Sequence, residues 1–90
     1  MNIEHIVDEK KFRVLLGKEE AHLLYRELPD GNLDFHSTFV PDSGRGMGLA
    51  KKIVEAGVSF AKKEGKKILP SCSYVKRYLE SDDNLKSLKL

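Results

Sequence analysis

The sequence predicts an α+β fold in which an antiparallel meander is followed by a parallel β-α-β crossover and a short C-terminal helix. Three observations predict this order. Up to residue 40, alternating apolar and polar residues are interrupted by short turn signals, which is typical of hairpins. A glycine-rich loop then leads into a long segment whose apolar residues recur at helical spacing. A second short apolar run follows, and a second helical pattern comes after it.

Length and composition are those of one small domain covering residues 1–90. The chain has 40% hydrophobic and 33% charged residues, which is ordinary for a soluble globular protein. Its net charge of +2 is too small to indicate a nucleic-acid partner. A single cysteine, Cys72, allows no internal disulfide and favours a reducing compartment. Residues 1–8 show no secretory signal and no apolar run could span a membrane, so we expect a cytoplasmic protein with no membrane partner.

The meander is predicted from three extended segments. Residues 11–16 alternate in character, and Gly17 with Lys18 then forms a turn. Residues 20–28 could carry a helical stripe, but the turn signal at 29–32 favours a strand. Residues 33–40 form the third strand, with Leu33, Phe35, Ser37 and Phe39 expected on one face and Asp34, His36, Thr38 and Val40 on the other.

The crossover is predicted from the second half of the chain. The helix after the loop would bury a stripe of apolar residues and end at Gly65, the stripe being Leu49, Ala50, Ile53, Val54, Ala56, Gly57, Phe60 and Ala61. Residues 67–71 read as a buried strand that is ended by Pro70. Residues 73–80 form a short helix with Val75, Tyr78 and Leu79 inward, and we expect the polar segment 81–90 to dock loosely.

This topology predicts where a ligand would bind. Strands joined by a right-handed crossover are parallel neighbours, so they should end at the same edge of the sheet. Ligands of open α/β sheets bind beyond the carboxyl ends of the strands, here beside Val40 and Cys72. His36, Thr38 and Cys72 are therefore candidates for one small site.

The glycine loop predicts a bound phosphate. Glycines let backbone N–H groups approach an anion, and the N-terminus of the following helix adds its positive dipole end. A Walker loop does not fit, because Gly48 is followed by Leu49 and Ala50 rather than by lysine and a hydroxyl residue. A dinucleotide-binding loop starting at Gly44 would require a glycine at position 49.

The run Arg45-Gly46-Met47-Gly48-Leu49-Ala50 does fit a known pattern. It resembles the Arg/Gln-x-x-Gly-x-Gly/Ala pyrophosphate loop of the GNAT superfamily of acyl-CoA-dependent N-acetyltransferases. The segments 36–41 and 70–75 extend the resemblance to the small single-domain members sometimes called minimal acetyltransferases. The match spans residues 33–80, about half of the chain.

The resemblance implies a GNAT-like core that binds acetyl-CoA. Backbone N–H groups of Arg45, Gly46, Met47, Gly48, Leu49 and Ala50 would hold the pyrophosphate, and the strand at Phe39 and Val40 would pair with the pantetheine amides. The thioester would lie close to Cys72. The acceptor would be an amine, on a small molecule or at a protein lysine or N-terminus, and the protein a monomer or weak homodimer. These 90 residues do not include the extra helices and strands that build the acceptor pocket of larger members.

Two residues are candidates for chemistry. Cys72 could be a nucleophile that accepts the acetyl group, or a small buried apolar residue. His36 could be the general base that takes a proton from the acceptor, or a residue that bonds to a neighbouring strand. Direct attack of the amine on the thioester is preferred to an acetyl-cysteine intermediate, since the sequence supplies no clear base for the thiol.

Alternatives to an enzyme stay open at this point. The domain could bind CoA or acyl-CoA without catalysis, or it could bind a nucleotide. The 3′-phosphate of CoA could meet Lys51, Lys52, Lys76 or Arg77, and the sequence does not choose among them. We expect no metal site, because there is one cysteine and no His-x-x-x-His pair.

Overall fold

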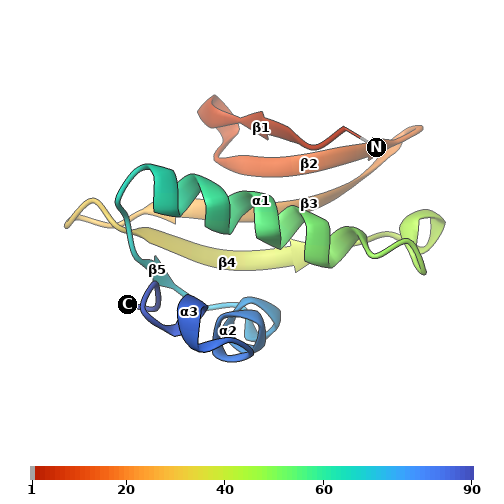
Figure 1. The fold of residues 1–90 in the computed structure, drawn as a ribbon. Helices are drawn as coiled ribbons and strands as arrows, with labels where there is room; N and C mark the ends of the chain where they lie inside the picture. Colours follow the sequence, from red (N-terminus) through yellow and green to blue (C-terminus); the bar gives the residue numbers. More distant parts are fainter. Residues whose placement is uncertain (1) are drawn as a thin grey trace.

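The computed structural model describes residues 2–90 as a five-stranded sheet with one long helix across a face (Figure 1). The elements are β1 (Glu4–Ile6), the 3₁₀ turn η1 (Val7–Glu9), β2 (Lys11–Leu16), β3 (Glu19–Glu27), β4 (Leu33–Phe39), η2 (Asp42–Gly44), α1 (Leu49–Lys63), β5 (Ile68–Leu69), α2 (Ser73–Glu80) and α3 (Asp83–Lys86). The strands lie in sequence order. β1 to β4 are antiparallel and β5 is parallel to β4, which confirms the predicted α+β order.

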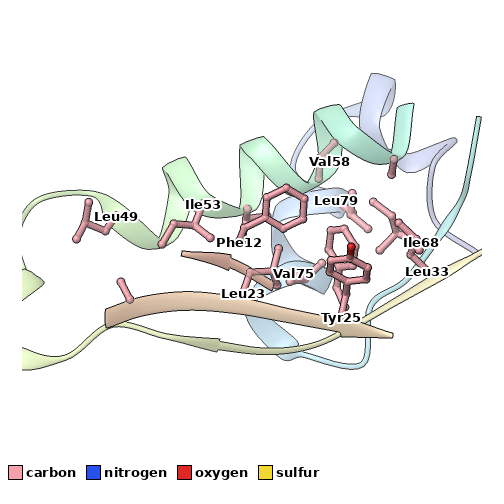
Figure 2. Close-up of a cluster of buried hydrophobic side chains, with 14 of the residues drawn as sticks. Phe12, Leu23, Tyr25, Leu33, Leu49, Ile53, Val58, Ile68, Val75 and Leu79 are labelled. Carbon is pink, nitrogen blue, oxygen red and sulfur yellow. The ribbon is translucent and has the colours of Figure 1, made fainter. Parts of the chain in front are cut away.

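The hydrophobic core lies between the sheet and the inner face of α1. In β2 the alternation buries Phe12 and Val14, and in β3 it buries Ala21, Leu23 and Tyr25. Figure 2 shows that most of the labelled side chains gather beneath the later turns of α1, while Leu49 lies at the other end of the helix. Gly57 of α1 lets the helix lie close to the sheet, because a Cβ there would be only 2.7 Å from Leu23 Cδ2.

A bulge in β4 corrects the predicted faces of that strand. Tyr25 pairs with Phe35, whereas Leu24 pairs with Ser37, so His36 is an extra residue in β4. Beyond the bulge the alternation is reversed. Thr38 lies opposite the buried Leu23, and Phe39 is an exposed neighbour of His22 rather than a member of the Phe35 face.

The predicted second strand is shorter than expected. β5 pairs only Ile68 with Leu33 and Leu69 with Asp34, at the beginning of β4. The two strands are parallel neighbours, as expected, and run toward the same edge of the sheet, but β5 stops beside Asp34 whereas β4 continues to Phe39. Among residues 2–90, no strand lies beside the second half of β4 on its β5 side.

The segment after α2 is more ordered than the predicted loose tail. It contains α3, and Leu85 and Leu88 pack against the core. The Ile68 N–H donates to the Leu88 carbonyl (2.7 Å), and the Leu90 N–H donates to the Ile68 carbonyl (2.8 Å). These bonds place the end of the chain along the outer side of β5, where Figure 1 shows the C-terminus.

β1 was not predicted, because three residues are too few for a recognisable alternation. Its His5 stacks on Phe12 with ring centroids 4.0 Å apart. His5 Nε2 and the Tyr25 hydroxyl are 2.7 Å apart, within hydrogen-bond distance. Side-chain packing with later strands therefore fixes this short strand at the edge of the sheet.

Candidate functional site

The glycine loop connects the end of β4 to the start of α1, as Figure 1 shows. Gly46 and Gly48 have φ angles of 81° and 69°, a left-handed backbone that other residues adopt only with strain. Gly44 is buried, and a Cβ there would lie 2.6 Å from Leu16 Cδ1. Gly46 and Gly48 therefore shape the turn, and Gly44 allows the loop to pack against Leu16 of β2.

The start of α1 is suited to an anion. Its N-cap is Gly48, which offers no side-chain cap, and the first turn has no acidic residue. The first backbone N–H groups of a helix have no intrahelical acceptor. Uncapped N–H groups and the helix dipole together make this end of α1 electropositive.

A cavity of about 380 Å³ opens at this end of the helix. It is lined by Thr38, Val40, Gly44, Arg45, Gly46, Gly48, Leu49, Ala50 and Tyr74. Six of these are residues that the resemblance assigned to the cofactor: Val40, Arg45, Gly46, Gly48, Leu49 and Ala50. Phe39 and Met47, assigned to the same role, are exposed and do not line the cavity.

The Arg45 side chain reaches solvent. It is 68% exposed, and its Nε is 3.3 Å from an Asp42 carboxylate oxygen. An exposed pair of this kind contributes little to stability, so the guanidinium can turn toward a ligand at small cost.

Cys72 contacts Thr38, and Thr38 lines the cavity. Its backbone N–H donates to the Phe35 carbonyl (3.1 Å), and its thiol donates to the Thr38 hydroxyl, with 3.6 Å between Sγ and Oγ1. Residue 72 is the N-cap of α2, so its side chain lies at the N-terminal end of that helix, although it forms no capping hydrogen bond. The first half of β4 and the start of α2 thus converge at this thiol.

The pKa of the Cys72 thiol lies below its ordinary value. Burial raises this pKa, but the nearby backbone N–H groups of Val75 and Tyr74 and the Thr38 hydroxyl favour the thiolate and outweigh burial. The Cys72 thiolate therefore forms more readily than that of an ordinary cysteine.

His36 takes no part in this thiol contact. It is the extra residue of the β4 bulge and is half-buried. Among residues 2–90, its side chain forms no hydrogen bond or ion pair. It does not line the cavity that Thr38 shares with Tyr74.

Sequence reasoning missed Asp34, a charged residue buried where β4 and β5 diverge. Asp34 is 2% exposed, and its carboxylate accepts hydrogen bonds from the Ser71 hydroxyl (2.6 Å) and from Arg26 Nε (2.8 Å). The Ser71 bond holds the chain beside β4 one residue before Cys72. An acidic residue within an apolar strand was the only local signal for this arrangement.

Among the described residues 2–90, no group of three His, Cys, Asp or Glu side chains is arranged to hold a metal ion. In the same residues, no helix combines the length and apolar character needed to cross a membrane.

Comparison with known proteins gives consistent matches. The family model for the GCN5-related N-acetyl-transferase matches residues 11–88. NATD1 proteins of Xenopus tropicalis and Homo sapiens are each 31% identical over 84 residues, covering 91% of this chain and 77% and 74% of those proteins. The NMR structure of a GCN5-like protein from Staphylococcus aureus superposes with a TM-score of 0.75 at 30% identity, covering 99% of this chain and 87% of that one.

Proposed function

Because the chain belongs to the GCN5-related N-acetyltransferase family, we propose that it binds acetyl-CoA and transfers the acetyl group to an amine. One observation in the structure of this chain supports the proposal. The cavity of about 380 Å³ is lined by the glycine loop, by the N-terminus of α1 and by Thr38, whose hydroxyl contacts the Cys72 thiol. A ligand with a pyrophosphate at one end and a thioester at the other suits this arrangement.

The loop would bind the pyrophosphate. Backbone N–H groups from Arg45 to Ala50 surround the start of α1, and no carboxylate of the first helical turn opposes an anion. Arg45 would add a charge-assisted hydrogen bond after leaving Asp42. Phe39 and Met47 would contribute through their backbone, since their side chains are exposed.

The pantetheine arm would lie along the open side of β4. β5 pairs only with Leu33 and Asp34, so later backbone groups of β4 have no strand partner on that side among residues 2–90. Amide groups of the arm can pair with such an edge as an added strand does. This course leads from the loop past Val40 and Thr38 toward Cys72.

Transfer would proceed by direct attack. The neutral amine nitrogen attacks the thioester carbonyl carbon, a bond between carbon and sulfur breaks, and CoA leaves as its thiolate. A backbone N–H freed by the β4 bulge would stabilise the oxyanion. His36, the bulge residue, would accept the proton that the amine loses.

The lowered pKa of Cys72 favours a second route through the same site. There the Cys72 thiolate attacks the carbonyl carbon, CoA leaves, and the amine then takes the acetyl group from sulfur. Both routes consume one acetyl-CoA and one amine, and they differ in whether an acetylated protein forms.

The test is release of CoA from acetyl-CoA in the presence of a panel of amines and peptides, measured by chromatography. We expect release above the uncatalysed rate with at least one acceptor. For direct transfer, Cys72→Ala and Cys72→Ser should both keep kcat within about tenfold of the native protein. Binding of CoA without any release above background would contradict the enzyme and favour a binding module.

The two routes are separated by mass spectrometry of the intact protein incubated with acetyl-CoA alone. Direct transfer predicts no stable acetyl group on the native protein. An acetyl group present on the native protein and absent from Cys72→Ala, together with a loss of activity in that variant, would instead establish the cysteine route.

A further inference from the structure

A cluster of rings joins β1 to the rest of the core. His5 of β1 stacks on Phe12 of β2, with ring centroids 4.0 Å apart and an interplanar angle of 14°. The same imidazole meets Phe60 of α1 edge-on, with 4.5 Å between the centroids. Its Nε2 is 2.7 Å from the hydroxyl of Tyr25 in β3. One half-buried side chain of β1 thus contacts two neighbouring strands and the long helix.

β1 has few other attachments to the molecule. It pairs with β2 over only three residues. The ion pair between Glu4 and Arg13 (3.2 Å) involves a half-exposed carboxylate, so it contributes little to stability. Ile3, just before β1, also packs against the core. Ile3 and His5 therefore provide most of the side-chain contact that holds β1 at the edge of the sheet.

The surroundings of His5 favour the neutral imidazole. Burial lowers the pKa of His5, and no charged group contributes to this shift. Within residues 2–90, no carboxylate oxygen lies within 4.0 Å of its ring nitrogens, whereas His22 Nδ1 is 3.0 Å from Glu20. Burial and the charge of Glu27 raise the pKa of Tyr25, so its hydroxyl stays protonated and can donate to Nε2 of a neutral His5.

The charged residues of the elements around His5 are not placed to pair with an imidazolium. Three of them alternate with His5 and Phe12 along β1 and β2 and so lie on the opposite face of the sheet: Glu4, Lys11 and Arg13. Lys10 is paired with Glu27 (3.2 Å). Others are exposed to solvent: Asp8, Glu9, Arg26, Glu27, Lys63 and Glu64. In the part of the chain that the structure describes, a protonated His5 would lose hydration without gaining a counter-ion.

We propose that β1 is a pH-sensitive element that detaches from the sheet when His5 is protonated, which makes β2 the edge strand. The pKa of His5 is lower in the docked strand than its ordinary value of about 6.5. Docking is therefore favoured above about pH 6.5, and this contribution is lost as the pH falls through the docked pKa. Detachment replaces an edge strand of three residues by one of six, Lys11–Leu16. The inference is independent of the proposed function.

The test is hydrogen–deuterium exchange measured by mass spectrometry at pH 7 and pH 5, with rates corrected for intrinsic exchange. Protection of a peptide covering residues 2–10 should fall by about threefold to 30-fold at pH 5. The upper limit is the ratio of protonated to neutral imidazole at pH 5 for a pKa of about 6.5. A peptide covering α1 should stay better protected than the β1 peptide at both pH values, because β1 opens without unfolding of the core.

Two variants remove the titration in different ways. His5→Phe keeps a stacked ring, and His5→Gln keeps a hydrogen-bond acceptor for Tyr25. In both variants, protection of the β1 peptide should differ by less than about twofold between the two pH values. His22→Gln is the matched control, because His22 is paired with Glu20 and lies outside the cluster around His5. This control should keep the native pH response.

Four results would overturn the inference. The first is equal protection of β1 in the native protein at pH 7 and pH 5. The second is higher protection at pH 5, which would show that the rings attract the imidazolium more strongly than burial disfavours it. The third is a native pH response in both His5 variants, which would assign the response to another group. The fourth is equal protection of β1 and α1 at pH 5, which would mean that the whole domain unfolds.

Discussion

The two halves of β4 have opposite surroundings. Residues 33–35 are all buried and pair with β3; on the other side Leu33 and Asp34 pair with β5, and the Phe35 carbonyl accepts from the Cys72 N–H. Residues 36–39 are half-buried or exposed; His36 is the bulge residue, and residues 37–39 pair with β3 alone. The first half fixes the strand in the core, and the second half carries the unpaired edge that borders the proposed acetyl-CoA site. A chain of 90 residues can thus keep one strand rigid while leaving part of it free to bind.

The largest difference in the free energy of unfolding should appear when a phenylalanine is truncated to alanine in each half of β4. Phe35 is 0% exposed and Phe39 is 49% exposed. Phe35→Ala should lower the free energy of unfolding by about 3–5 kcal/mol, through lost burial and the cavity it leaves. Phe39→Ala should change it by less than about 1 kcal/mol. Urea denaturation followed by circular dichroism measures both.

One result would contradict the expected difference between Phe35 and Phe39. A chain of this length has a stability of about 5–13 kcal/mol, so Phe35→Ala is expected to be close to its folding limit. Equal losses in the two variants would mean that both halves of β4 contribute equally to the core.

A smaller effect is expected at Asp34, the buried charged residue two positions before the bulge. Burial raises the pKa of Asp34. The Ser71 hydroxyl, the Arg26 guanidinium and the charge of His36 lower it by a larger amount, so the pKa lies below the ordinary value. The folded pKa is thus below the unfolded one. The ionised carboxylate therefore adds stability above the unfolded pKa of about 3.9, and this is lost as the pH falls through the folded pKa.

Asp34→Asn should therefore reduce the free energy of unfolding by about 1–3 kcal/mol at pH 7, and by less at pH 3. Urea denaturation at both pH values measures this change. Asp42→Asn is the matched control, because Asp42 is exposed and its pair with Arg45 is expected to contribute little. The same loss from Asp34→Asn at pH 3 and at pH 7 would show that its charge does not stabilise the fold.

The smallest effect concerns the open half of β4. Thr38→Val keeps the shape of the side chain but removes the hydroxyl that stabilises the Cys72 thiolate. The pKa of Cys72 should rise, so the rate of alkylation by iodoacetamide should increase at higher pH than in the native protein. Ser37→Ala is the control, since Ser37 pairs with Leu24 on the other face of the sheet. An unchanged alkylation profile would mean that the hydroxyl has no influence on the thiol.

Local patterns in the sequence predicted much of the fold. The structure confirms β2 over residues 11–16 and α2 over residues 73–80 with the predicted bounds. In both segments the periodicity of burial is set by residues within the segment. The loop between β4 and α1 was predicted for the same reason, because its glycines determine the backbone there.

Features that depend on distant partners could not be predicted. The bulge at His36 follows from the register between β3 and β4, and it reversed the expected face of Phe39. The burial of Asp34 depends on Ser71, which is 37 residues away. The cavity shared by Tyr74 and Thr38 needs the crossover to bring α2 back to β4. Each of these properties belongs to a pair of segments and leaves no pattern in either one.

The bonds between Ile68 and the end of the chain bear on how the protein behaves at high concentration. A sheet whose outer strand has free N–H and C=O groups can add a strand from another molecule and aggregate. Here Leu88 and Leu90 bond to the outer side of β5. At the opposite margin, β1 is only three residues long. Both margins of the sheet thus offer a second molecule little backbone to pair with, which protects a domain whose proposed binding edge along β4 must stay open.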